Sequence, residues 1–302
     1  MRTTNELQQY FQQPESLLKM DCEKVARKIQ DFLRDYLSEA KCKGYIIGIS
    51  GGVDSAVVAY LATDAVGKDN IYGLLLPSKY TSEESVFDGE LVARNLGFKY
   101  EKTDPKQIEN VLNVILKGTP KSADQNVQKI REGNIQARTR MIFLRDRARA
   151  LNYLVAGTGN KSELMTGYST VAGDGFGGVD VEPIAPLYKT QVWNLAEYLG
   201  VPKQIIEKTP SAELWLDQKD ESELGISYLN LDKILLGFEL QVVPKEISEI
   251  LNLDIKKVNE IQNRVSANKF KTQLPPKPDT FFDVNFKRND EKCENNSSRK
   301  KV

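Results

Sequence analysis

The chain has 302 residues, and its 42 lysines and arginines balance 42 aspartates and glutamates, so the formal net charge is zero. Because nucleic-acid-binding proteins usually carry a basic excess, this balance argues against a nucleic-acid partner. No apolar run is long enough to span a bilayer, and the polar segment 1–15 has no signal-peptide core.

The chain contains no histidine, which excludes Ser-His-Asp and Cys-His nucleophilic sites and argues against a catalytic zinc ion. Its chemistry must rely on carboxylates, lysine, arginine, hydroxyls, backbone amides and metal ions, a set that suffices for nucleotidyl transfer. The three cysteines, Cys22, Cys42 and Cys293, are too widely spaced for a disulfide framework or a metal site. We therefore expect a cytoplasmic protein with no membrane partner.

Apolar residues at helical spacing predict a helix over 15–42, after a polar N-terminal lead at 1–14. Short apolar runs predict strands at 45–49, 71–76, 98–101 and 154–156. Helices are predicted at 55–66, 81–97, 105–117, 123–151, 188–199, 203–208, 226–236, 244–251 and 254–268. This alternation favours an α/β fold: a doubly wound, mostly parallel sheet with helices on both faces, as a single domain over 15–280. The polar segment 281–302 is predicted to be a disordered tail.

A glycine-rich turn joins the first predicted strand to the next helix. It comprises Gly48, Ile49, Ser50, Gly51, Gly52, Val53, Asp54 and Ser55. A strand–turn–helix of this kind points backbone N–H groups and a helix N-terminus at one spot, which suits a phosphate. Asp54 can hold Mg²⁺. No G-x-x-x-x-G-K-[ST] occurs, so the turn lacks a lysine for a γ-phosphate and suits a pyrophosphate unit that leaves whole. The alternative is a tight connection without a ligand.

A second glycine-rich segment, 157–163, follows the predicted strand 154–156. In parallel sheets, ligands bind beyond the carboxyl ends of the strands. We therefore expect this segment and the turn at 50–55 to face one cleft.

Five motifs in order resemble those of one family. The pattern SGGxDS at 50–55 resembles the signature of the ATP pyrophosphatases, a superfamily with an adenine nucleotide alpha-hydrolase-like fold. Four further stretches, 134–141, 157–170, 187–191 and 210–225, resemble segments of NAD synthetases in the same order. The resemblance covers about 20–278. On these motifs, the chain is identified as a member of the NAD synthetase family.

The resemblance implies that ATP adenylates the carboxylate of deamido-NAD and that ammonia then displaces AMP to give NAD. It implies ATP contacts from residues 48–55 and from Thr158, Lys189 and Ser211. Mg²⁺ would be shared by Asp54 and Glu163, and deamido-NAD would meet Arg138, Asp180, Phe270 and Lys271. Lys189 could steady the departing pyrophosphate. Asp174, between two glycines, is the candidate to take a proton from ammonium, although a turn residue is the alternative.

Two departures from the family pattern concern the dinucleotide. Val171 stands where many ammonia-using members have a lysine, and Phe270-Lys271 replaces a His-Lys pair. The arginines of 138–149 lie on two edges of the predicted helix, Arg140 and Arg147 on one of them, and a solvated basic face is the alternative for most.

The sequence argues against one variant of this reaction and leaves two other functions open. Glutamine-dependent members carry a nitrilase-like domain, for which the roughly 40 residues before the first strand are too few. A tRNA-modifying or GMP-synthetase-like pyrophosphatase is a second function, and a non-catalytic nucleotide-binding regulator is a third. The family resemblance also implies a homodimer, with the helices at 15–42 and 123–151 as interface candidates.

Overall fold

The computed structural model describes residues 11–13, 16–175 and 177–276. The chain divides into two compact units, Met1–Thr272 and Gln273–Val302, and the fold below is that of the first. The predicted tail at 281–302, Cys293 and most of the predicted lead lie outside the described residues. Within the described part, no helix has the length and apolar character needed to cross a membrane.

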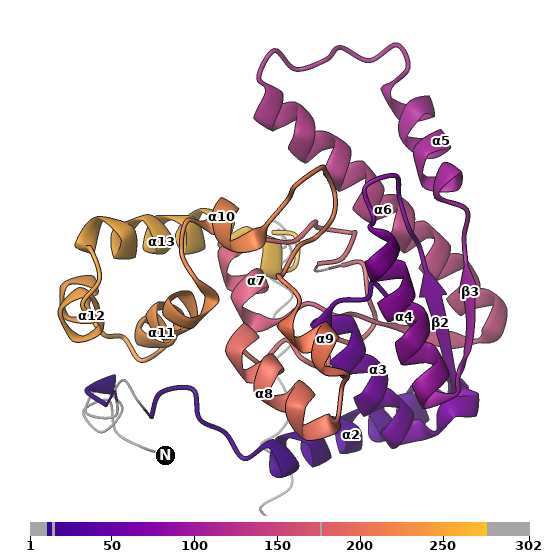
Figure 1. Ribbon diagram of the computed structural model, residues 1–302, viewed down its shortest axis with the longest axis horizontal. Helices are drawn as coiled ribbons and strands as arrows, with labels where there is room; N and C mark the ends of the chain where they lie inside the picture. Colours follow the sequence, from indigo (N-terminus) through magenta and orange to yellow (C-terminus); the bar gives the residue numbers. More distant parts are fainter. Residues whose placement is uncertain (1–10, 14–15, 176, 277–302) are drawn as a thin grey trace, which may run out of the picture. The chain divides into compact units, whose positions relative to one another are not determined.

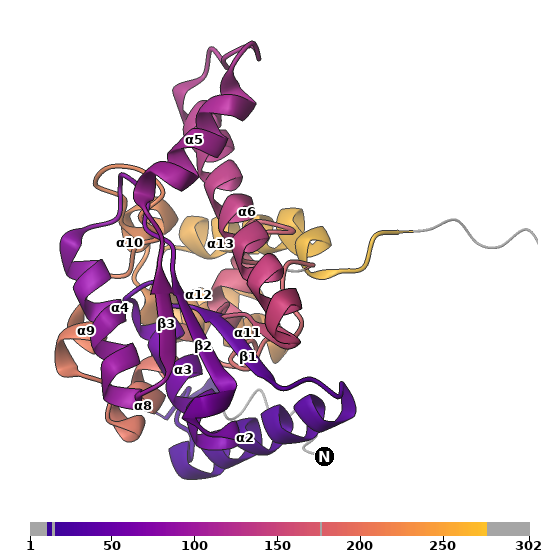
Figure 2. The ribbon, with the colours of Figure 1, turned by 90° about the vertical axis from the view of Figure 1, so that its right-hand side faces the viewer.

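Four parallel strands form the sheet at the centre of the fold (Figure 2). They are β1 (Gly44–Gly48), β2 (Ile71–Leu75), β3 (Lys99–Lys102) and β4 (Tyr153–Ala156), in the order β3-β2-β1-β4. The chain moves outward from β1 to β3 and then returns to place β4 on the other side of β1. Ligands in such sheets bind at this reversal, beyond the carboxyl ends of β1 and β4.

Helices cover both faces of the sheet, which confirms the predicted fold class. The alternation of side chains along each strand sends Tyr45 and Ile47 to one face and Ile46 to the other. The first face packs against α2 (Cys22–Glu39), α3 (Val53–Val66), α4 (Glu83–Leu96) and α8 (Lys189–Leu199). The second packs against the long helix α6 (Gln125–Leu151) through Met141 and Leu144.

A second group of helices forms its own core beside α7 (Lys161–Thr166) and α8. It contains α11 (Tyr228–Glu239), α12 (Pro244–Leu251) and α13 (Ile255–Asn268), with Phe11 fully buried among them. Three further helices are α5 (Pro105–Leu116), α9 (Lys203–Glu207) and α10 (Asp220–Leu224), and two short 3₁₀ turns span Lys68–Asn70 and Lys269–Thr272. In Figures 1 and 2, α5 and the start of α6 extend away from the sheet.

The predicted helix over 15–42 is wrong at its beginning. Helix α2 begins at Cys22 because Asp21 acts as its N-cap and accepts a hydrogen bond from Lys24 N–H. Leu17 and Leu18 share the helical spacing, but they pack into the core around α11–α13 instead. Leu18 also has a positive φ of 68°, which no helix continues through. Helix α10 was not predicted.

Candidate active site

The glycine-rich turn sits at the carboxyl end of β1, as the sequence predicts, and opens α3. Gly51 has φ +81°, and a Cβ at this position would lie 2.0 Å from the carbonyl oxygen of Ser85 on α4. Both facts require glycine there. The turn thus packs directly on the first turn of α4, and only a residue without a side chain permits that approach.

Two serine hydroxyls hold the turn in shape from within. Ser55 Oγ accepts a hydrogen bond from Ser50 N–H at 3.2 Å and donates to the Gly52 carbonyl at 3.0 Å. Ser50 Oγ accepts from Gly52 N–H at 3.2 Å. Gly52 is the N-cap of α3 and brings no side chain to cap the helix. The first N–H groups of α3 are therefore open to an anion that enters the turn.

Asn160 connects the second glycine-rich segment to the first. Its Oδ1 accepts from Glu163 N–H at 3.0 Å, which caps α7, and its Nδ2 donates to Asp54 Oδ1 at 2.9 Å. Asp54 lies in the first turn of α3, and Glu163 lies in the first turn of α7. One amide thereby fixes two carboxylates from distant parts of the chain next to each other, as the cleft expected from the sequence requires.

Lys189, the first residue of α8, lies between these two carboxylates. Its Nζ is 2.5 Å from Asp54 Oδ2 and 3.4 Å from Glu163 Oε1, and its side chain is only 4% exposed. Burial alone would lower the pKa of Lys189, but the two carboxylates raise it above its ordinary value. Burial, with Asp54 adding to it, raises the pKa of Glu163 to about 8 against the opposing effect of Lys189. The ammonium of Lys189 is thus balanced by Asp54, and Glu163 is a carboxyl group that a bound cation would deprotonate.

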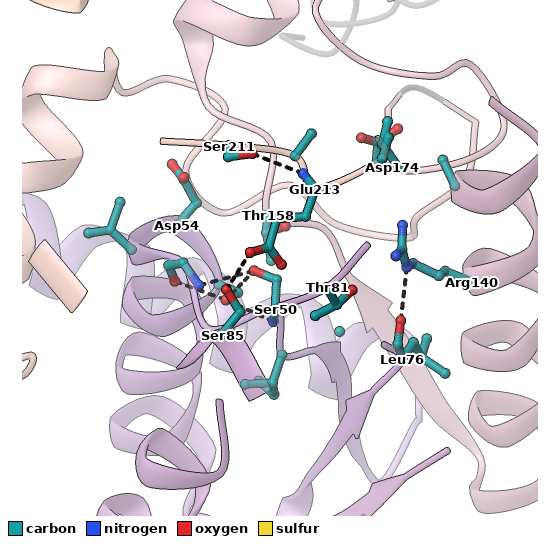
Figure 3. Close-up of a pocket in the computed structure, with 18 of the residues that line it drawn as sticks. Ser50, Asp54, Leu76, Thr81, Ser85, Arg140, Thr158, Asp174, Ser211 and Glu213 are labelled. Atoms are coloured by element: carbon teal, nitrogen blue, oxygen red, sulfur yellow. Dashed lines mark hydrogen bonds between the residues drawn. The ribbon is translucent and has the colours of Figure 1, made fainter. Parts of the chain in front are cut away.

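Asp54, Glu163 and Lys189 line a pocket of about 290 Å³ at the carboxyl edge of the sheet. Figure 3 shows this pocket, with Asp54, Thr158 and Asp174 among the labelled residues. Its wall contains most of the predicted ATP, metal and catalytic residues: Gly48, Ile49, Ser50, Gly52, Val53, Asp54, Ser55, Thr158, Glu163, Asp174, Lys189 and Ser211. Gly51 is the exception and lies against Ser85. Apolar side chains from β2, β4 and α6 line another part of the wall, including Leu75, Met141 and Leu144, and further polar side chains complete it. The pocket therefore joins an anion-binding turn to an apolar slot, as a nucleotide requires.

The sequence profile of the family described as NAD synthase matches residues 25–275. The chain belongs to the NAD synthase family. It is therefore a ligase that forms a carbon–nitrogen bond. Over 263 residues it is 41% identical to the NH(3)-dependent NAD(+) synthetase of Methanosarcina mazei, a match that covers 87% of this chain and 100% of that protein.

Solved structures agree with this assignment. The NMN synthetase from Francisella tularensis has a TM-score of 0.74 at 30% identity, covering 87% of this chain and 100% of that one. The NH3-dependent NAD synthetase from Campylobacter jejuni has a TM-score of 0.71 at 29% identity, covering 86% and 100%. Together with the profile, these similarities confirm the family predicted from the sequence and its parallel α/β fold.

In this NAD synthase chain, the four residues predicted to bind deamido-NAD do not line the pocket. Arg138 Nε donates to the Val171 carbonyl at 3.2 Å, and Asp180 pairs with Arg145 at 2.6 Å. Lys271 Nζ donates to the Gly167 carbonyl at 2.7 Å, whereas Phe270 is 66% exposed. Their predicted role therefore concerns surfaces outside the pocket.

Arg140 lines the pocket, although the sequence placed it only on an edge of its helix. Its Nε donates to the Leu76 carbonyl at 3.0 Å (Figure 3). Burial lowers its pKa, against the effect of Asp174 and Glu213. The other two cations of the pocket wall are each paired with acids, Lys189 as above and Lys208 with buried Asp88 at 3.0 Å. In the described part of the chain, Arg140 has no acid within ion-pair distance.

Asp174 borders the same pocket from the loop after α7. Its Oδ1 accepts from Thr170 N–H at 2.8 Å. Burial raises the pKa of Asp174 above the ordinary aspartate value, although Thr170 and Arg140 oppose the shift. A carboxylate with a raised pKa accepts protons more readily than a solvated aspartate, which is the property expected of a general base.

The donor set beside the turn fits a magnesium ion. Mg²⁺ keeps several waters and is commonly held by one or two carboxylates together with substrate phosphates. Asp54 and Glu163 supply two carboxyl groups next to the glycine-rich turn, and because the pKa of Glu163 is raised, a divalent cation bound there would displace a proton from Glu163. No group of three or more Asp, Glu, Cys or His side chains with metal-binding geometry occurs in residues 11–13, 16–175 and 177–276. Two carboxyl groups suit a metal that arrives with nucleotide, because the phosphates would supply further ligands.

Proposed function

We propose that this chain amidates the nicotinate carboxylate of deamido-NAD with ammonia, at the expense of ATP, and releases NAD, AMP and diphosphate. The observation that carries the proposal is the meeting of Asp54, Glu163 and Lys189 beside an SGGxDS turn in one pocket. The strong similarity to ammonia-dependent NAD synthetases over most of the chain supports the same reaction.

ATP would enter with its β- and γ-phosphates in the turn at 50–55. There the first N–H groups of α3 and the hydroxyl of Ser50 donate to phosphate oxygens. Thr158 and Ser211 border the same space and would add hydroxyl donors. The adenosine would occupy the apolar slot beside Met141 and Leu144. This orientation would direct the α-phosphate from the turn toward the part of the pocket that Asp174 lines.

Asp54 and Glu163 would hold Mg²⁺, which supplies positive charge against the phosphates as negative charge develops on the leaving group. A carboxylate oxygen of deamido-NAD attacks the α-phosphorus, the bond between the α-phosphorus and the bridging oxygen breaks, and diphosphate departs. Lys189 stabilises the charge that collects on the diphosphate, because its ammonium is held in place before the reaction. The product is an acyl adenylate.

In the second step, ammonia attacks the acyl carbon of the adenylate, and the carbon–oxygen bond to AMP breaks. The nitrogen loses one proton in this step, and we assign that proton to Asp174. Its carboxylate lines the pocket and is raised in pKa by burial. Arg140 has no acid partner in the described part of the chain, so its guanidinium would form an ion pair with an anionic group of a bound substrate.

We further propose a cytoplasmic homodimer. Apolar side chains are exposed on the two helices that extend from the sheet: Val114 on α5, and Val127 and Ile130 on α6. Exposed apolar side chains that lie together on one part of the surface are typical of a subunit interface. Cys22 and Cys42 are free thiols, as a reducing compartment would leave them. Sedimentation of the protein as a monomer at micromolar concentration would contradict the dimer.

A second substrate is favoured by one comparison. The structural neighbour from Francisella tularensis is an NMN synthetase. Here the predicted dinucleotide residues lie outside the pocket, and Val171 and Phe270 depart from the family pattern. Amidation of the mononucleotide of nicotinic acid, by the same two steps, is therefore the alternative reaction.

The test is a direct comparison of substrates. The purified chain is incubated with ATP and Mg²⁺ and with either deamido-NAD or nicotinate mononucleotide, each with ammonium or glutamine as the nitrogen donor. We expect NAD and AMP to form in equal amounts from deamido-NAD and ammonium. A kcat/KM for the mononucleotide above that for deamido-NAD would establish the alternative, and no amide with either substrate would refute both.

A further inference from the structure

Asp232 on α11 is completely buried, and the two steps above give it no task. Its Oδ1 accepts a hydrogen bond from Ser162 Oγ at 2.5 Å. Its Oδ2 accepts two bonds from Thr190, one from the backbone N–H and one from Oγ1, both at 2.8 Å. Burying a carboxylate costs free energy unless hydrogen bonds compensate for lost water. Three donors converge on Asp232, so its surroundings are specifically arranged for it.

The partners of Asp232 directly adjoin Glu163 and Lys189 in the sequence. Ser162 precedes Glu163 in α7, and Thr190 follows Lys189 in α8. Ser162 Oγ also accepts from the backbone N–H of Lys189 at 2.9 Å. A helix usually finds acceptors for its first N–H groups in its own N-cap residue. Helix α8 instead finds them in Ser162 and Asp232, which belong to two other helices.

Helix α11 contacts Lys189 at a second point. The ring of Tyr228 lies 5.3 Å from Lys189 Nζ, measured to its centroid. Tyr228 and Asp232 are four residues apart and therefore share one face of α11. The Tyr228 ring faces the ammonium, while Asp232 acts on the backbone from which the lysine side chain starts. Helix α11 therefore constrains the ammonium group of Lys189 through Tyr228 and the backbone next to Lys189 through Asp232.

We propose that Asp232 is a positioning residue: through Ser162 and Thr190 it fixes the start of α7 to the start of α8, and so holds Glu163 and Lys189 at the separation that binds the phosphates of ATP. The inference deepens the proposed function and rests on it. If Asp232 has only a structural role, replacing it should lower the stability of the protein and nothing else. If it positions Glu163 and Lys189, replacing it should also change how the folded protein uses ATP.

Two substitutions separate these roles, with one control. Ser162→Ala removes the middle of the network and leaves the bonds from Thr190 to Asp232 intact. Asp232→Asn keeps the shape of the side chain but removes its charge. If its amide nitrogen faces Thr190, the Thr190 N–H loses its acceptor; if it faces Ser162, that hydrogen bond must reverse, with Ser162 Oγ accepting in place of donating. Ile234→Ala is the control, because Ile234 is fully buried on the same helix and touches none of these groups by hydrogen bond.

Kinetics and thermal unfolding are measured for all three variants. We expect Ser162→Ala and Asp232→Asn to lower kcat/KM for ATP about five- to tenfold, the effect of a lost buried hydrogen bond, with KM for ammonium unchanged. Ile234→Ala should lower the Tm and leave kcat/KM for ATP as in the wild type. The proposal is overturned if both network variants keep wild-type kinetics, or if the control lowers kcat/KM for ATP as much as they do.

A second readout does not depend on turnover. Acetylation of lysines by an amine-reactive reagent, quantified by mass spectrometry, reports how firmly Lys189 is held. We expect Lys189 to react severalfold faster in both network variants than in the wild type or Ile234→Ala. If the wild-type chain makes no NAD, the proposed function fails, while the labelling still decides whether Asp232 holds Lys189. Equal labelling in all four proteins would overturn the inference.

Discussion

Lys189 and Asp54 form a buried ion pair, with Nζ and Oδ2 2.5 Å apart, although they are separated by 135 positions in the sequence. The pair joins the start of α8 to the start of α3, and Glu163 completes it from the start of α7. Three helices therefore begin at one point beyond the carboxyl edge of the sheet. Their N-termini and the lysine make this point favourable for phosphate, while the two carboxylates make it favourable for a metal cation.

Replacing Lys189 should show how far its ammonium stabilises the neighbouring carboxyl groups. In Lys189→Met, the Asp54 carboxylate loses its buried counter-charge and Glu163 stays protonated, so the free energy of unfolding should fall by about 3–5 kcal/mol. Added Mg²⁺ should raise the Tm of the variant more than that of the wild type, because the cation replaces the missing charge. Lys161→Met is the control, since its pair with Glu239 is partly exposed and contributes at most about 1 kcal/mol. If Lys189→Met unfolded at the same denaturant concentration as the wild type, the stabilising role of Lys189 would be contradicted.

Arg140 should act on substrate through its charge. Replacing it with alanine removes the pocket cation that has no acid partner in the described part, so kcat/KM should fall about 10- to 100-fold, as for a lost hydrogen bond to a charged group. Arg140→Lys should recover part of the loss. Arg147→Ala, on the same helix but paired with Glu101 at 3.0 Å, should change kcat/KM little. Equal kinetics for Arg140→Ala and the wild type would show that Arg140 meets no anion.

Asp174 should affect the second step and spare the first. We expect Asp174→Asn to keep the deamido-NAD-dependent exchange of diphosphate into ATP, while NAD formation falls about 10²–10⁴-fold, the range for a general base. The exchange reaction serves as the internal control for folding and substrate binding. If NAD formation and exchange fall together, Asp174 serves adenylation or structure instead.

The raised pKa of Asp174 gives this step a pH dependence with a definite sign. Only the ionised carboxylate accepts a proton, so the wild-type ratio of NAD formation to exchange should decrease as the pH falls through that pKa. Because burial raises the pKa, the decrease should begin at a higher pH than for an ordinary aspartate. Measuring both reactions over one pH series at constant free ammonia tests this expectation. A ratio independent of pH would contradict it.

Local patterns were enough to predict the sheet and the glycine-rich turn that follows β1. The strands are short apolar runs, and the turn at Gly51 follows one of them, so no distant contact is needed to recognise either. The meeting of Asp54 with Glu163 was also predictable, because the carboxyl ends of parallel strands share one edge. The start of α2 was not, since Leu17 fits the helical spacing but packs in another core.

Other features depend on contacts that spacing does not encode. Arg140 and Arg147 lie on the same edge of α6, and only the packing of that helix on the sheet decides which of them enters the pocket. Asp232 gives no sequence signal at all, because its partners are Ser162 and Thr190, 70 and 42 positions away. The residues that could be read from the sequence are those that form motifs, and the groups that hold them in place come from the tertiary fold.

The central claim is that Asp54 and Glu163, from two distant segments, serve one metal–nucleotide site. The most direct measurement compares Asp54→Asn with Asp64→Asn, which changes an aspartate of the same helix outside the pocket, by calorimetric titration with ATP and Mg²⁺ and by NAD formation. We expect Asp54→Asn to stay folded, to bind the metal nucleotide weakly and to lose at least about 10²-fold in kcat/KM, as for removal of one charge-stabilising group, while Asp64→Asn behaves as the wild type. Wild-type nucleotide binding and turnover in Asp54→Asn would contradict the account.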